Sequence, residues 1–339
     1  MKKRIELPLV EPLYKTYHHQ GPATAIIPDN PSIRNWFLNE SVNLVCTRRF
    51  LQGYTSPEIS IELSDWMSNP YFEQHHVSSQ FTKGYIHPII REMIDHGLYV
   101  IFSGVDDYYV KGKSWYKERH FSHDGMICGY DQNNKSYCVY AYDDNWVYRK
   151  FWTPQKAFYA GIAHMQTEKV FSGFCGLKVK EDVVSFSPQT AYAKIKEYLD
   201  SDLIKYPFAE EGCVLGIAVH RYIAEYILKL HEGQIPYERM DRRVFRLLWE
   251  HKKAMLERIV LLEQELHLDN EISCSYKRLV LAADTMRMMY ASHHMKRRDS
   301  ILLTLNRLLL KLMEDERGLL TQLVWKAERE LENEVVEVS

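Results

Sequence analysis

A histidine and an aspartate flank a predicted β-hairpin, and together they have the chemistry of a general base with its orienting acid. His123 precedes a strand expected at residues 126–130, and Asp143 follows one expected at 137–142. The polar stretch 131–135 between them is typical of a turn. Because one strand runs out and the next runs back, we expect His123 to lie beside Asp143. A carboxylate there would fix the imidazole tautomer and stabilise its charged form. The alternative is that both are ordinary turn and surface groups.

The segments around this hairpin indicate an α+β domain at about 1–185, followed by a mostly helical domain at about 188–335. The first domain is expected to contain helices at 31–46, 88–96 and 153–158 and strands at 98–102, 146–151 and 170–180. Composition changes near Ser187 and Pro188. From there, helical periodicity predicts segments at about 188–201, 212–231, 237–267, 271–294 and 297–332.

Composition excludes several classes of protein. The chain has 339 residues and a formal net charge of -2, so it lacks the basic field typical of nucleic-acid binding. No apolar run is long enough for a transmembrane helix, and the start does not have the pattern of a secretion signal. The six cysteines form no C-x-x-C pair, so free thiols in a reducing cytoplasm are expected.

A nucleophile to complete a triad is harder to find. The start of a helix favours a cysteine thiolate, and the predicted helices begin near Ala23 and at 30–32, where there is no cysteine. Cys46 falls at the far end of the predicted helix 31–46, and Cys128 and Cys138 fall inside predicted strands. Those two are interpreted as small core residues.

The sequence from 120 to 131, H-F-S-H-D-G-M-I-C-G-Y-D, and the stretch 137–144 resemble the N-terminal family of butirosin biosynthesis protein H. The helix that carries Trp36 and Leu44 adds to the resemblance, which covers roughly residues 10–180. It implies a papain-like fold related to the double-glycine peptidases, with an antiparallel sheet and a nucleophile helix. It also implies a Cys-His-Asp triad.

The resemblance assigns roles to particular residues. His123 matches the histidine and Asp143 the acid, with Asp144 and Asn145 as near alternatives. Ala23 stands where the family has its cysteine, and Gln20 matches the glutamine that helps to form the oxyanion hole. Ala23 is then either a replaced cysteine or the mark of a natural pseudoenzyme. Ser32 is the other candidate nucleophile, although it is more simply a first-turn residue.

The implied activity is that of an amide-forming acyltransferase or transamidase, as in antibiotic pathways such as closthioamide assembly and nonribosomal peptide synthesis. The acyl group would come from the phosphopantetheine thioester of an acyl or peptidyl carrier protein and go to a small amine. A cysteine peptidase or thioester hydrolase and an inactive scaffold protein remain as alternatives. Six basic residues are candidates for contact with an acidic carrier, with plain solubility as the alternative: Arg242, Arg243, Lys252, Lys253, Arg297 and Arg298.

A metal site is not expected, and no cofactor beyond the carrier arm is implied. The histidines at 18–19, 75–76 and 293–294 are adjacent pairs, which point apart in a helix or strand. The sequence contains no H-E-x-x-H motif.

Overall fold

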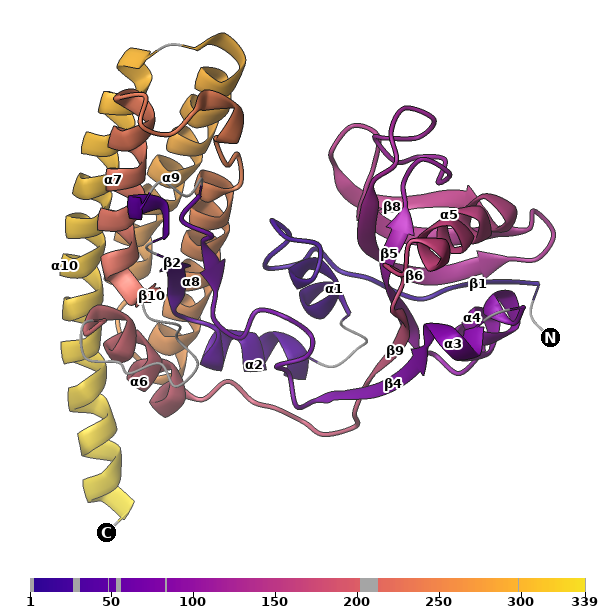
Figure 1. Ribbon diagram of the computed structural model, residues 1–339. Coiled ribbons are helices and arrows are strands. Elements are labelled where there is room, and N and C mark those ends of the chain that lie inside the picture. Colours follow the sequence, from indigo (N-terminus) through magenta and orange to yellow (C-terminus); the bar gives the residue numbers. More distant parts are fainter. Residues whose placement is uncertain are drawn as a thin grey trace. The chain divides into compact units, whose positions relative to one another are not determined.

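The computed structural model divides the chain into two compact units, shown in Figure 1. It describes residues 3–26, 31–47, 49–52, 56–82, 84–201, 213–297 and 299–338. The first unit, here called the sheet unit, comprises Met1–Arg34 and Asp65–Val184. The second, the helical unit, comprises Asn35–Ser64 and Ser185–Ser339.

The sheet unit is built on an antiparallel sheet in the order β4-β9-β5-β6-β7-β8. β5 pairs with β6 as far as Ile127, and β1 pairs with β6 from Gly129 onward. The strands are β1 (Arg4–Glu6), β4 (Phe72–Ser78), β5 (Tyr99–Asp106), β6 (Ser122–Asp131), β7 (Ser136–Tyr142), β8 (Tyr148–Pro154) and β9 (Gly173–Val179). The helices are α1 (Gln20–Ala25), α3 (Ser79–Thr82), α4 (Ile86–Asp95) and α5 (Gln155–Thr167).

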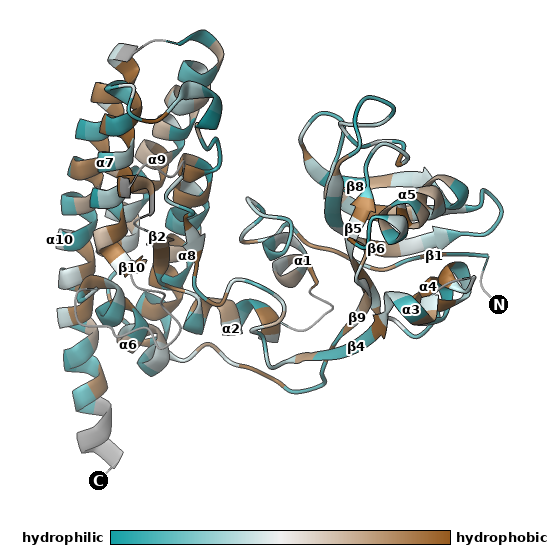
Figure 2. Cartoon of the chain, viewed as in Figure 1, coloured by the Kyte–Doolittle hydropathy of each residue, from teal (hydrophilic) through white to brown (hydrophobic). Residues whose placement is uncertain are grey.

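Two amphipathic helices close the core of this sheet. Ile90 and Ile94 of α4 and Phe158 and Ile162 of α5 are buried in one cluster with inward-facing strand residues such as Val100. Apolar positions at three- and four-residue spacing give each helix one face to bury, which stabilises the packed arrangement. Brown and teal therefore alternate around these helices in Figure 2.

The helical unit combines a helix bundle with a small antiparallel sheet in the order β10-β2-β3. Its strands are β2 (Leu44–Thr47), β3 (Ser60–Ile61) and β10 (Cys213–Leu215). The α-helices are α2 (Ser32–Glu40, which starts in the sheet unit), α6 (Pro188–Leu199), α7 (Val219–His231), α8 (Val244–Glu265), α9 (Glu271–Lys296) and α10 (Asp299–Val338). Short 3-10 helices lie at Arg49–Gln52, Gly216–Ala218 and Tyr237–Arg239. In α10, the predicted stripe contributes buried leucines such as Leu302, Leu305, Leu309, Leu312 and Leu323.

The predicted α+β class, with an antiparallel sheet and a helical C-terminal region, is confirmed. Residues 35–64 are the main difference, because the sequence placed them in the first domain. Arg258 of α8 donates to the carbonyl oxygens of Phe37 at 3.2 Å and Ser41 at 3.1 Å, and β2 pairs with β10. These contacts hold the segment in the helical unit.

The helix predicted at 31–46 is too long. α2 ends at Glu40, and Leu44–Thr47 form strand β2. Leu44 and Cys46 are buried, while Val45 and Thr47 are partly exposed, which is the two-residue period of a strand. The helix predicted from 212 likewise begins only at Val219, after β10. In the described part of the chain, no helix is both long and apolar enough to cross a membrane.

Candidate functional site

His123 has a carboxylate partner, and that partner is Asp107. The Nδ1 atom of His123 is hydrogen-bonded to Oδ2 of Asp107, the residue that follows β5. β5 and β6 bring them together, because Val105 pairs with His123 and the Asp107 amide donates to the Phe121 carbonyl. The Asp107 side chain is 2% exposed and the His123 side chain 16%. A buried carboxylate therefore orients a histidine that solvent can still reach.

Asp143 does not orient His123, which corrects the expectation from the hairpin. Its Oδ1 atom accepts hydrogen bonds from the amides of Asn145 and Val147, both at 2.9 Å, and Oδ2 forms an ion pair with Arg149. The carboxylate thus closes the turn between β7 and β8. The ladder between β6 and β7 runs from the pair Met126–Tyr140 to the pair Asp131–Ser136, so it stops short of His123. The near alternatives Asp144 and Asn145 are exposed and hydrogen-bond to each other.

Lys113 and His18 complete the surroundings of the pair. The Lys113 Nζ atom lies 3.5 Å from Oδ1 of Asp107, and burial lowers the pKa of this lysine. The ring of His18 stacks on that of His123 with centroids 4.6 Å apart. Burial, and next the charge of Lys113, hold the pKa of His18 well below its usual value, so its ring is neutral at pH 7. One face of the His123 ring is therefore covered by an uncharged aromatic group.

Ala23 lies in the fourth position of α1, and its side chain is fully buried. This six-residue helix begins two residues after His18. Gln20 is its first residue, and the side-chain Oε1 atom accepts a hydrogen bond from the Tyr17 amide at 3.4 Å. His18 is thus the link that brings the start of α1 to His123. None of the described contacts of His123 is with a cysteine, serine or threonine.

The other candidate nucleophiles have structural contacts. Ser32 is buried; its hydroxyl donates to the Asp182 carbonyl at 3.2 Å and accepts from the Val184 amide at 2.7 Å. Cys46 lies in strand β2 and not at the end of a helix. Cys128 and Cys138 are buried on neighbouring strands with their sulfur atoms 3.6 Å apart.

Sequence reasoning missed a cysteine–histidine contact that joins residues 99 positions apart. The Cys175 Sγ atom lies 3.8 Å from Nε2 of His76, across the pair β4 and β9. Both line a cavity of about 310 Å³, together with Ser103, whose hydroxyl donates to Asp124 at 2.7 Å. Burial raises the pKa of the Cys175 thiol to about 11, so it is protonated at neutral pH and a poor nucleophile.

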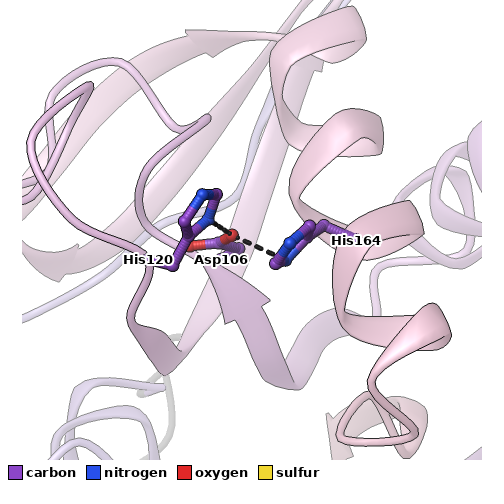
Figure 3. Close-up of side chains that lie close together, drawn as sticks. All are labelled: Asp106, His120 and His164. Carbon is purple, nitrogen blue, oxygen red and sulfur yellow. Dashed lines mark hydrogen bonds and ion pairs between the residues drawn. The ribbon is translucent and has the colours of Figure 1, made fainter.

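A second histidine–carboxylate group was also missed. Asp106, His120 and His164 converge from the end of β5, the loop before β6 and the last turn of α5 (Figure 3). The Oδ2 atom of Asp106 lies 2.7 Å from Nδ1 of His120 and 2.9 Å from Nδ1 of His164. In the sequence, the only signal was that Asp106 adjoins Asp107 and that His120 precedes His123 by three residues.

Of the five described basic residues expected to meet a carrier protein, Arg242 is exposed, and the others differ in burial and contacts. Lys252 is fully buried and bonded to Glu316, and Arg243 is paired with Asp241. Lys253 and Arg297 lie over the rings of Trp249 and Tyr237. Arg298 lies outside the described residues.

No known family model matches this sequence, and no curated protein matches it either.

Proposed function

We propose that the sheet unit is a papain-like domain that transfers an acyl group from a carrier-protein thioester to a small amine, with His123 as the general base. The observation that carries the proposal is the buried Asp107 carboxylate on Nδ1 of a partly exposed His123. Donation of the Nδ1 proton to Asp107 leaves Nε2 as the basic nitrogen. A base of this kind typically contributes about 10²- to 10⁴-fold to a rate.

The resemblance sets Ala23 at the position of the family's cysteine, so we propose direct transfer without an acyl-enzyme. The amine nitrogen attacks the thioester carbonyl, and the carbon–sulfur bond breaks. Nε2 of His123 takes the amine proton and delivers it to the leaving sulfur, so the pantetheine thiol and the amide are the products. Gln20 is the proposed donor to the oxyanion. The proposed place for the acyl chain is the cavity lined by Ser103. Ser103 is hydrogen-bonded to Asp124, which follows His123 in the chain.

A test uses the full chain, an N-acetylcysteamine thioester and a primary amine, with the amide measured by mass spectrometry. His123→Ala should lower the rate by about 10²- to 10⁴-fold. His96→Ala is the matched control, because His96 is an exposed histidine of the same unit. Equal rates in the wild type and the His123→Ala variant would overturn the role of His123.

The intact protein mass tests position 23. Ala23→Cys should take up the acyl group and lose it when the amine is added. If the Ala23→Cys protein stays unmodified, Ala23 is not the nucleophile position. Faster release of free acid than of amide would favour the thioester hydrolase instead.

A non-catalytic binding protein is the second candidate, favoured by the His18 ring stacked on His123 and by Ala23 itself. It predicts binding of the acyl thioester without turnover, unchanged by His123→Ala.

A further inference from the structure

We propose that Asp106, His120 and His164 form a binding site for a divalent first-row transition ion of the Zn²⁺ type. One ligand atom from each residue lies within 4.8 Å of the others, although the residues are up to 58 positions apart in the chain (164 − 106). Two imidazoles and one carboxylate are a ligand set that suits Zn²⁺ and its transition-metal neighbours. Mg²⁺ and Ca²⁺ prefer oxygen ligands and fit this set poorly.

The orientation of the Asp106 carboxylate is fixed by the backbone. Its Oδ1 atom accepts hydrogen bonds from the amides of Tyr108 at 3.1 Å and Phe121 at 3.0 Å. These bonds occupy Oδ1 and direct Oδ2 toward the two histidines, as Figure 3 shows. The carboxylate is fully buried, while the side chains of His120 and His164 are 51% and 31% exposed. Asp106 would therefore hold an ion on its buried side, and solvent could reach the ion on the side of the histidines.

The two imidazoles are held side by side. Their rings stack at 4.5 Å with an angle of 16° between planes, and the Tyr108 ring stacks on the far side of His120 at 4.4 Å. This packing holds the Nδ1 atoms of both rings at the same carboxylate oxygen, Oδ2 of Asp106.

The Nδ1 atom of His164 gives an independent indication. It is buried and forms no hydrogen bond, although it lies 2.9 Å from Asp106 Oδ2, because the geometry of that contact is not that of a hydrogen bond. A buried nitrogen of this kind is suited to an ion. Ligand atoms around a tetrahedral Zn²⁺ are about 3.3 Å apart, so the two distances from Asp106 to the histidines would lengthen by roughly half an ångström.

Gly161 explains why α5 comes close enough to contribute His164. A Cβ atom at position 161 would lie 2.9 Å from the Asp106 carbonyl oxygen and 3.1 Å from Val105. Only glycine permits this approach of helix to strand end, and His164 follows one turn later on the same face. The protein thus supplies three ligands and leaves further coordination positions to water or a substrate.

The experiment uses the full chain, stripped of metal with a chelator and titrated with Zn²⁺ by calorimetry and with Co²⁺ by visible absorption. The wild type should bind one equivalent of Zn²⁺ and develop the d–d bands of Co²⁺ with nitrogen and oxygen ligands. His120→Ala and Asp106→Asn should each weaken binding by more than about 100-fold, since even loss of an outer hydrogen-bond partner weakens metal sites 10- to 100-fold.

Two controls keep the outcome interpretable. His96→Ala removes an exposed histidine of the same unit and should leave Zn²⁺ affinity within twofold of the wild type. Zn²⁺ should raise the thermal unfolding midpoint of the wild type and not that of the His120→Ala variant, since an ion stabilises only a folded state that binds it. If the wild type binds no Zn²⁺, or if a His120→Ala/His164→Ala double variant binds it as tightly as the wild type, the proposal is wrong.

Discussion

The two units each place a buried carboxylate against a histidine and a lysine. In the sheet unit, Asp107 contacts His123 and Lys113. In the helical unit, Glu316 lies 2.6 Å from the Lys252 Nζ atom and 3.5 Å from Nε2 of His220.

Burial is what separates the two groups. The side chains of Glu316, Lys252 and His220 are all fully buried, whereas His123 keeps part of its ring exposed. The Glu316 carboxylate also accepts hydrogen bonds from the hydroxyls of Tyr198 at 2.9 Å and of Tyr276. It is enclosed by its own partners. The group in the helical unit is therefore closed to solvent, whereas solvent reaches the group in the sheet unit at His123.

The largest expected effect comes from removing the charge of Glu316. Glu316→Gln leaves the Lys252 ammonium buried without its counter-charge, and loss of one partner of a buried pair destabilises by about 3–5 kcal/mol. The free energy of unfolding from urea denaturation measures this. Glu328→Gln is the matched control: Glu328 is about half exposed and accepts a hydrogen bond from Tyr192 at 2.7 Å. Exposed pairs of this kind contribute about 0–1 kcal/mol. Equal losses in the two variants would contradict the contrast between the units.

A variant that removes both the Lys252 and the Glu316 charge tests the same contrast. Lys252→Met combined with Glu316→Leu should be less destabilising than Glu316→Gln alone, because no unpaired charge then remains buried. A double variant at least as unstable as the single one would mean that the ion pair itself stabilises the bundle.

In the sheet unit, the corresponding change should affect activity as well as stability, because Asp107 is also the counter-charge of the buried Lys113. Asp107→Asn should reduce amide formation by about 10²- to 10⁴-fold, because His123 loses the group that fixes its tautomer. Asp143→Asn is the matched control, since Asp143 was the acid expected from the sequence and instead closes a turn. Nitrogen NMR of the imidazoles should show a changed His123 tautomer in the Asp107→Asn variant only. A larger rate loss in the Asp143→Asn variant would restore the acid expected from the sequence.

The sequence was sufficient for much of the local structure and insufficient for long-range partners. Strands β6 and β7 and helices α8 to α10 follow from periodicity and turn residues, which depend on near neighbours in the chain. The identity of the acid beside His123 depends on how β5 and β6 pair, and on the register shift between Phe102 and Val105. The prediction from the hairpin considered only two strands that are adjacent in sequence, so it selected Asp143 as the acid. His164 was out of reach for the same reason, since α5 packs on β5 through residues far apart in the chain, such as Phe158 on Phe102.

The buried histidines of the bundle should give the helical unit a measurable acid sensitivity. Burial, and next the charge of Lys252, lower the pKa of His220 from its usual 6.5 to about 3. The unfolded chain then binds a proton that the folded protein does not, so stability is lost as pH falls from 6.5 toward 3. His220→Gln keeps a donor for the Ile217 carbonyl and should make the slope of stability against pH shallower by up to about 1.4 kcal/mol per pH unit.

His96→Ala is the control for this slope, because it removes an exposed histidine of the other unit. The measurement is urea denaturation at several pH values between 3 and 7. An unchanged slope in the His220→Gln variant would mean that this histidine is protonated in the folded protein. Burial in the helical unit would then not cause the acid sensitivity expected of it.

The smallest expected effect concerns Ser32, a hydroxyl of the sheet unit that is enclosed as fully as the groups around Glu316. It bridges the Asp182 carbonyl and the Val184 amide, and loss of such hydrogen bonds destabilises by about 1–2 kcal/mol. Ser32→Ala should therefore lower the free energy of unfolding by about that amount and leave amide formation unchanged. Amide formation that disappears in a Ser32→Ala protein of normal stability would instead identify Ser32 as the nucleophile. A fully buried side chain would then take part in catalysis, and burial would not separate the structural residues of this chain from the catalytic ones.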